Sequence, residues 1–241
     1  MFVWCAYCQR YSGERAPYDQ YTLTHGICAT CQAREITDEE ILAMREISAF
    51  YGGVLESALA GQPVSDFIAR GRALGLRSLD LLVGILQPVL YEVGKAWERG
   101  TIATEVEARF SKLCDEVITT LDRELVVTSG RRIMLLAAHW NRHTLGLRMT
   151  AYRLRDAGFD VRVVAPTPPL DQLCSMIEAI EPEIVGVSVA TEWQLGFLEE
   201  LAAIIATSRL RPRIVAGGLA VRAGVELPAG VERWDPSSER V

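Results

Sequence analysis

The sequence predicts an α/β protein, in which a doubly wound parallel sheet is preceded by a four-helix bundle and a small zinc-ribbon-like module. Three observations lead to this prediction: two C-x2-C pairs near the start, apolar residues at helical spacing in the middle, and apolar β-rich runs alternating with helical patterns thereafter. The expected domains are residues 1–35 for the module, 36–127 for the bundle and 132–241 for the α/β domain.

Composition narrows the functional class. The 241 residues include 25 Lys and Arg against 31 Asp and Glu, a formal net charge of −6, which disfavours direct binding to nucleic acid. Hydrophobic residues make up 49% and charged residues 23%, as in ordinary globular proteins. No apolar run approaches the ~18 residues of a membrane span, and no signal peptide is visible. We therefore expect a cytoplasmic protein without a membrane partner.

Four cysteines form the first motif, Cys5, Cys8, Cys28 and Cys31, with the spacing C-x2-C-x19-C-x2-C. Each pair can place two thiolates on one ion, and two pairs together make a closed tetrahedral zinc site. A segment this short has too small a core to fold alone. We therefore expect zinc to supply its folding energy. Metal-free cysteine pairs, or two disulfides, are the alternative. The segment resembles a zinc-ribbon-like tail found on many bacterial sensory proteins.

The middle of the chain reads as four helices joined by short loops. Apolar residues recur at helical spacing over residues 41–55, and further helices are expected at about 65–74, 78–99 and 103–125. Pro88 should kink the third of these, because proline lacks the N–H of the helical ladder. Helices of this length with short connections are typical of a four-helix bundle.

The remaining chain alternates strand and helix. Four apolar runs predict strands, at Ile133–Ala138, Val161–Ala165, Ile184–Val189 and Ile214–Ala216. Helical patterns separate them, at Leu145–Asp156, Leu170–Ile180 and Phe197–Ser208. This alternation indicates a parallel sheet that is buried on both faces, with ligands beyond the carboxyl ends of its strands. No G-x-G-x-x-G follows the first strand, which gives little support to a nicotinamide or flavin site.

Three loops at those carboxyl ends carry the candidate binding residues. The first contains Asn141, His143 and Gly146, the second contains Ser188, Ala190 and Thr191, and the third contains Gly217 and Gly218. Small residues at strand ends would let a large ligand approach the backbone. A lone loop histidine would otherwise be taken as a surface residue.

Taken together, these loops resemble the cobalamin-binding domain shared by methionine synthase, corrinoid proteins and B12-dependent light sensors. That family carries D/E-x-H-x-x-G, then S-x-L, then G-G, and the intervals between the motifs also match. Upstream, GKAWERGTIATEVEARFSKL resembles the family's helical capping bundle, in which light-sensing members carry W-x9-E-H. Here that pattern reads Trp97, Glu107 and Ala108.

The resemblance implies a role for each matching residue. His143 would be the lower cobalt ligand, with Asn141 accepting from its other ring N–H. Ser188, Gly217 and Gly218 would hold the displaced nucleotide tail, with Thr191 as a further contact. Trp97 would shield the upper face, and Glu107 would bond the ribose of adenosylcobalamin. The ligand would sit between the bundle and the α/β domain.

Departures from the pattern leave other tetrapyrroles open. Asn141 replaces an acidic residue, Ala190 replaces a larger apolar residue, and Ala108 stands where light sensors have a histidine. The pocket could therefore hold a bilin such as biliverdin, or haem. Cys114 would then be a possible thioether anchor for the bilin, although a buried core cysteine is the plainer interpretation.

We expect a sensory or regulatory protein, most simply a cobalamin-binding photoreceptor that signals through a protein partner or through self-association as a homo-oligomer. A bilin or haem sensor, a corrinoid methyl carrier and a structural module with an empty pocket are the alternatives. The sequence shows no nucleophile–base pair and no paired carboxylates, so enzyme activity is not expected.

Overall fold

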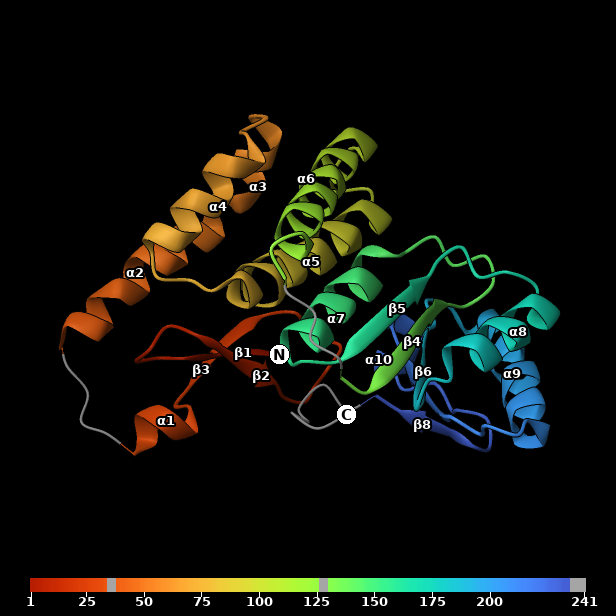
Figure 1. Cartoon of the computed structure of the whole chain (residues 1–241). Coiled ribbons are helices and arrows are strands. Elements are labelled where there is room, and N and C mark those ends of the chain that lie inside the picture. Colours follow the sequence, from red (N-terminus) through yellow and green to blue (C-terminus); the bar gives the residue numbers. More distant parts are fainter. Residues whose placement is uncertain (34–37, 126–129, 235–241) are drawn as a thin grey trace. The chain divides into compact units, whose positions relative to one another are not determined.

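The computed structural model describes residues 1–33, 38–125 and 130–234, with side chains of the second range from residue 45 onward (Figure 1). The expected domain boundaries at residues 35–36 and 127 lie outside the described residues. The chain divides into two compact units, of which the first ends at Glu124 and the second begins at Leu125. The four-cysteine segment and the helices both belong to the first unit. Within the described ranges, no helix combines the length and apolar content that a membrane crossing requires.

The first unit opens with a three-stranded sheet. Its central strand β1 (Phe2–Cys5) pairs antiparallel with β2 (Tyr11–Glu14) and parallel with β3 (Leu23–Gly26). A single helical turn, α1 (Ala29–Gln32), follows and carries the last of the four cysteines. The sheet brings the two C-x2-C pairs together, since one pair follows β1 and the other follows β3.

Helices make up the rest of the first unit (Figure 1). Their bounds are Asp38–Gly52 for α2, Val54–Leu59 for α3, Val64–Ala73 for α4, Asp80–Leu86 for the π-helical η1, Gln87–Glu98 for α5 and Thr104–Asp122 for α6. The first predicted helix is thus divided at Gly53, and the third begins as a π-helix before it continues as α5.

The cysteine segment contacts η1 at Gly84. Pro88 lacks the N–H that an α-helical bond to the Gly84 carbonyl would need, and the segment that contains Gly84 is π-helical. The indole N–H of the buried Trp4 donates to that carbonyl at 3.3 Å. Gly84 also has no side chain to keep the indole away, and a Cβ there would overlap the Trp4 ring.

A buried carboxylate makes the second contact between the sheet and η1. Asp80 is fully buried, and one of its oxygens accepts from the Tyr11 backbone N–H at 2.9 Å. Arg77 donates to both oxygens, through its backbone N–H and its guanidinium, at 2.8–2.9 Å. Because both oxygens are hydrogen-bonded and the charge is paired, burial of this carboxylate is tolerated.

The second unit is a five-stranded, all-parallel sheet with the order β5-β4-β6-β7-β8. The strands are β4 (Arg132–Ala137), β5 (Asp160–Val164), β6 (Ile184–Ser188), β7 (Arg213–Gly217) and β8 (Val231–Arg233). The helices are α7 (Leu145–Asp156), α8 (Leu170–Ile180), the 3-10 turn η2 (Glu192–Gln194), α9 (Leu195–Thr207) and α10 (Leu219–Arg222). The doubly wound α/β fold predicted from the sequence is confirmed.

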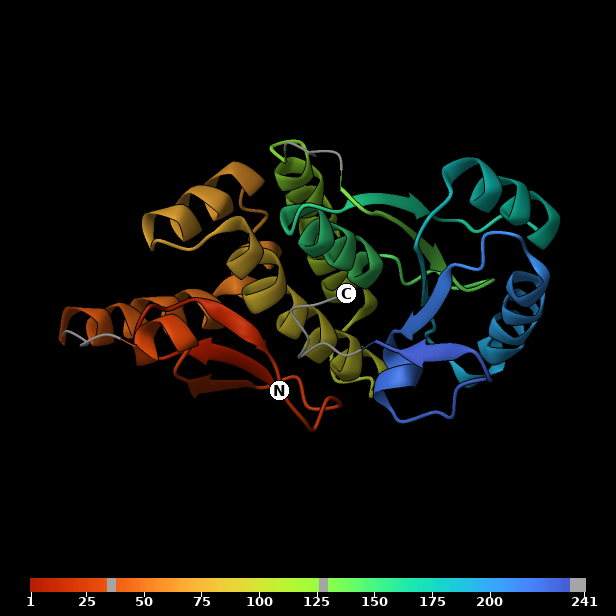
Figure 2. The same cartoon turned by 60° about the horizontal axis from the view of Figure 1, so that its bottom comes forward.

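Helices cover both faces of this sheet (Figures 1 and 2). Leu173 of α8 and Leu201 of α9 are fully buried against alternate residues of β4 and β6, such as Leu136 and Val187. Within the sheet, β4 lies between β5 and β6. The chain therefore adds β5 next to one edge of β4 and then returns to add β6 next to the other edge. The topological switch point, where such sheets bind ligands, therefore lies beyond the carboxyl ends of β4 and β6.

The contact between Trp4 and Gly84 predicts the effect of adding one methyl group. Gly84→Ala should lower the free energy of unfolding of the first unit by about 1–3 kcal/mol, because the new Cβ overlaps a buried ring. Gly94→Ala is the matched control in α5, where a Cβ meets nothing within 4 Å and alanine should stabilise the helix by about 0.5–1 kcal/mol. Chemical denaturation followed by circular dichroism measures both. Equal effects of the two variants would contradict the contact.

Candidate functional site

A buried side-chain amide fixes the loop that carries His143. The Asn141 amide nitrogen donates to the Ser188 carbonyl at the end of β6, at 2.9 Å. Its oxygen accepts from the backbone N–H of His143, also at 2.9 Å. Asn141 therefore positions the His143 backbone, while the His143 imidazole is exposed. The family resemblance implied that this oxygen would accept from the His143 ring, whereas here it accepts from the His143 backbone.

Gln194 joins the same two loops a second time. This side chain is only 3% exposed, and its oxygen accepts from the backbone N–H groups of Ala190 and Thr191, at 2.8 and 3.3 Å. Its nitrogen donates to the His139 carbonyl in the loop after β4, at 3.2 Å. Sequence reasoning missed Gln194, although Thr191-x-x-Gln194 has the spacing of a capping box, which the structure shows.

The loop after β7 begins with the two glycines. Gly218 has a φ of +102°, and a Cβ there would overlap backbone atoms of Val189. At Gly217 a Cβ would make ordinary contact with Trp234, at 3.4 Å. Only the second glycine is therefore required by the backbone, which brings the loop after β7 against the end of β6. Gly146 lies in the first turn of α7, after the His143 loop.

His139 is held by its surroundings. Its ring lies 4.5 Å from the ring of Phe197, and Nε2 lies 3.2 Å from the Pro168 carbonyl oxygen. His143 in the same loop is exposed. Of these two histidines, His143 is therefore the one whose ring is available to a ligand.

The remaining predicted binding residues belong to the first unit. Trp97 is 43% exposed, and its indole N–H donates to the Thr104 hydroxyl at 3.2 Å. Glu107 accepts from the Ser111 hydroxyl at 2.6 Å and is half-buried, while Ala108 is exposed. These residues lie near the end of α5 and in the first turns of α6.

Cys114 lies in the core of the same helical unit. Its side chain is fully buried, and burial raises the pKa of its thiol well above the ordinary range. Thioether formation needs an accessible thiolate. The surroundings of Cys114 are those of a core residue, and they give no support to an anchored bilin.

The four N-terminal cysteines form the candidate metal centre. Their four Sγ atoms all lie within 4.8 Å of one another, and those of Cys8 and Cys28 are 3.8 Å apart. A zinc ion with Zn–S bonds of about 2.3 Å requires an S–S separation of about 3.8 Å along each tetrahedral edge. All four are free thiols in the structure, with Cys5 and Cys31 buried. The donor set therefore fits a tetrahedral metal ion.

The thiols of this centre differ in acidity. Although burial opposes it, hydrogen bonds with the backbone of Cys28, Cys8 and Tyr7 lower the pKa of the Cys5 thiol to about 6. Burial, followed by hydrogen bonds to the other three cysteines, raises the pKa of Cys8 to about 12. Each of these thiols must lose its proton to bind a metal, so metal affinity should fall as the pH is lowered.

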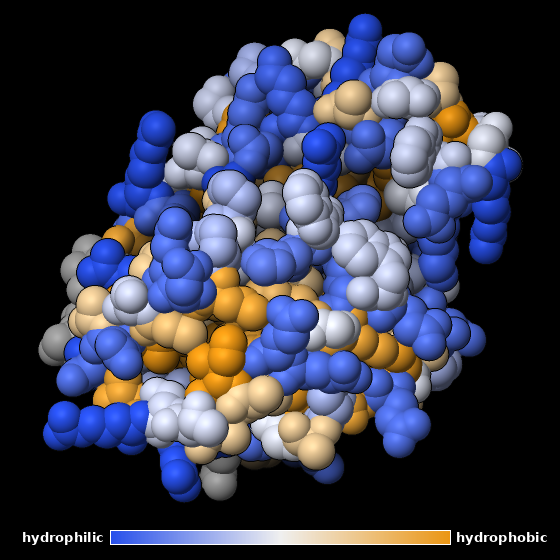
Figure 3. All heavy atoms as spheres, turned by 90° about the vertical axis from the view of Figure 1, so that its right-hand side faces the viewer, coloured by the Kyte–Doolittle hydropathy of each residue, from blue (hydrophilic) through white to orange (hydrophobic). Residues whose placement is uncertain are grey.

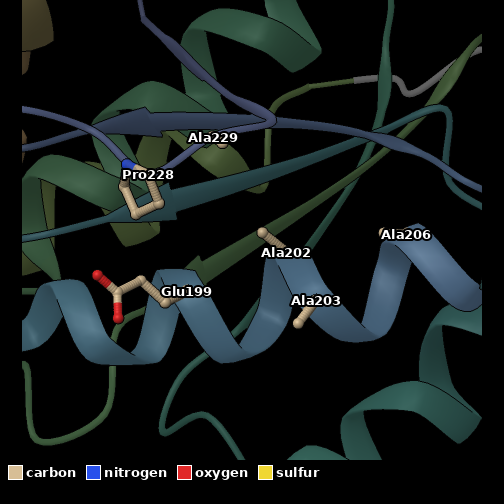
Figure 4. Close-up of a pocket in the computed structure, with 6 residues that line it drawn as sticks. All are labelled: Glu199, Ala202, Ala203, Ala206, Pro228 and Ala229. Carbon is tan, nitrogen blue, oxygen red and sulfur yellow. The ribbon is translucent and has the colours of Figure 1, made fainter.

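A pocket of about 330 Å³ lies elsewhere on the second unit (Figure 4). It is lined by Glu199, Ala202, Ala203, Ala206, Pro228 and Ala229, which come from α9 and from the loop before β8. Figure 3 shows the side of the molecule on which α8 and α9 lie, with hydrophobic residues gathered in its lower half between hydrophilic ones. The pocket contains none of the predicted binding residues, so it is separate from the switch-point site.

Comparison with known proteins gives a family match for the second unit. Residues 131–231 match the model of the B12 binding domain. The chain is 27% identical over 165 residues to the HTH-type transcriptional repressor CarH of Myxococcus xanthus, covering 63% of this chain and 54% of that protein. The chain thus spans about half the length of that curated relative.

A solved structure of a corrinoid protein shares the fold. The monomethylamine corrinoid protein of Methanosarcina barkeri superposes with a TM-score of 0.60 at 18% identity, over 73% of this chain and 84% of that one. A cobalamin-binding protein of Desulfitobacterium hafniense gives a TM-score of 0.41 at 17% identity, over 78% and 92% of the two chains, which is too distant to add to this. At 18% identity the likeness to the monomethylamine corrinoid protein shows the fold alone.

The hydrogen bonds of Asn141 predict that an acidic residue is not tolerated there. Asn141→Asp would place a carboxylate oxygen against the Ser188 carbonyl in place of a donor, which should destabilise the second unit by about 1–3 kcal/mol at neutral pH. Gln172→Glu makes the same chemical change at an exposed position of α8 and should have little effect. Thermal unfolding of the two variants distinguishes these outcomes. A fully stable Asn141→Asp protein would show that the loop can rearrange.

Proposed function

We propose that this chain, whose residues 131–231 belong to the B12 binding domain family, is a regulatory cobalamin sensor. The observation that carries the proposal is the exposed imidazole of His143, displayed at the switch point on a loop whose backbone Asn141 and Gln194 hold in place. A neutral imidazole is a good donor to cobalt. His143 would hold the metal from below, with the Ser188 hydroxyl and the backbone at Gly217 and Gly218 beside the nucleotide tail.

The alignment with the repressor CarH of Myxococcus xanthus favours a regulatory role. That protein is a repressor, although this chain spans only about half of it. We therefore propose a sensor that acts through a protein partner or through self-association, without chemistry of its own on a substrate. Direct binding to nucleic acid is not part of the proposal, in line with the acidic net charge of −6.

Light is the signal that this proposal favours. When bound, adenosylcobalamin supplies a cobalt–carbon bond that light can break. The residues that would respond to the upper group are Trp97 and Glu107, which are partly exposed in their own unit. Ala108 offers no ligand atom, so this position cannot provide a second histidine for cobalt. A bilin or haem ligand has no support from the comparisons, which match a B12 domain.

Retention of cobalamin tests the function. The protein is incubated in the dark with adenosylcobalamin, desalted, and its absorption spectrum is recorded before and after green light. We expect one retained cobalamin per chain and an irreversible spectral change. His143→Ala should lose the features of histidine ligation, while His25→Ala, which removes an exposed histidine from the first unit, should not.

Other outcomes lead to other functions. A retained spectrum that is indifferent to light would favour a methyl carrier or a light-independent sensor. Wild-type protein that retains no cobalamin would refute the proposal.

We further propose that the four-cysteine centre binds zinc as a structural ion. Purified protein should contain one zinc per chain by mass spectrometry, and Cys31→Ala should lose it and lower the unfolding temperature of the first unit. Cys174→Ala, in α8 of the second unit, is the control and should keep both. A stable, metal-free wild-type protein would contradict the zinc assignment.

A further inference from the structure

Two tryptophans at the switch point are unusually exposed. Trp140 is 85% exposed and Trp193 is 64% exposed, the two highest values among the large apolar residues of the described chain. Exposing an indole to water forgoes the free energy that its burial would supply. Two such residues on neighbouring loops therefore need an explanation.

Trp140 also has a strained backbone. Its φ of +65° lies in the left-handed region, where glycine is favoured and a bulky residue is rare. If this loop only had to turn, glycine would do so at lower cost. A tryptophan in this conformation suggests that its side chain serves a purpose outside the fold of the free protein.

Hydrogen bonds hold both tryptophans in place. Trp140 lies between His139, whose carbonyl accepts from Gln194, and Asn141, whose amide is bonded to Ser188. Trp193 directly precedes Gln194 and lies in the turn η2. The backbone beside each of the two exposed residues is thus tied to one buried side chain, that of Gln194.

We propose that Trp140 and Trp193 are the apolar contacts of this chain with the corrin ring of cobalamin, on the side of His143. The inference rests on the proposed function and adds to it the residues that favour a flat macrocycle. Trp140 is three positions before His143 in the same loop, and Trp193 belongs to the loop that Asn141 and Gln194 join to it. A broad, largely apolar ring bound by His143 would cover indole surface that is now in water and would keep water from the histidine.

The choice of a macrocycle over a protein partner follows from this placement. A protein surface that covered Trp140 would also cover the loop of the exposed His143, and would compete with any ligand there. A macrocycle uses the tryptophans and the histidine together. Self-association through the tryptophans is the competing outcome that the experiment distinguishes.

The test combines affinity, ligation and stability in the whole 241-residue chain. Trp140→Gly should weaken binding of aquocobalamin, measured by equilibrium dialysis, by about tenfold, the effect of losing one well-packed aromatic contact. The same variant should unfold at a temperature equal to or above that of the wild type, because glycine relieves the positive φ. A residue with only a structural role would show the opposite pattern, a lower unfolding temperature with unchanged affinity.

Further variants complete the design. Trp193→Ala should also weaken binding, Trp140→Phe should restore most of the affinity lost in Trp140→Gly, and the spectrum of histidine ligation should remain in all three. Ile27→Ala truncates an exposed apolar residue of the first unit and should change nothing. His143→Ala reports the loss of ligation by itself.

Failure of this inference can be told from failure of the proposed function. Wild-type retention of cobalamin with unchanged affinity in both tryptophan variants overturns the inference and leaves the function standing. A wild type that binds no cobalamin overturns both. A concentration-dependent dimer that Trp140→Gly abolishes without any change in affinity assigns the tryptophans to self-association, and also overturns the inference.

Discussion

Two buried side-chain amides, Asn141 and Gln194, hold together the part of the molecule on which the proposed function depends. Parallel strands end with unpaired backbone groups at one edge of the sheet, and each loop there needs both donors and acceptors. A carboxamide supplies both without a charge, so it can be buried between two loops at little cost. A carboxylate would leave the Ser188 carbonyl facing another acceptor. The display of His143 and of both exposed tryptophans follows from these few hydrogen bonds.

Sequence periodicity was sufficient for the centre of the parallel sheet, because β4, β6 and β7 are almost entirely apolar runs whose residues are buried. It was not sufficient for β8, whose Val231-Glu232-Arg233 is short and polar and is held by pairing with β7, where Arg213 bonds Glu232. The π-helical start of α5 was also missed. Pro88 predicted a kink. Trp4, whose indole donates to the Gly84 carbonyl in the π-helical segment, could not be predicted because it is distant in sequence.

The candidate site shows the same division between local and distant information. His143 could be found from its motif and its place after a strand, whereas the role of Asn141 could not, because its hydrogen bonds run to backbone groups in two loops. Gln194 carried only a local capping signal, and its bond to the His139 carbonyl depends on the strand order.

The bond between Trp4 and Gly84 joins residues that are 80 positions apart. During synthesis the chain is made from its first residue onward, so the strand that carries Trp4 is complete long before the carbonyl that its indole must reach. The first sheet cannot finish packing until the ribosome has passed Pro88. The cysteine segment therefore completes its packing only when η1 has been made, although the segment itself is synthesised first.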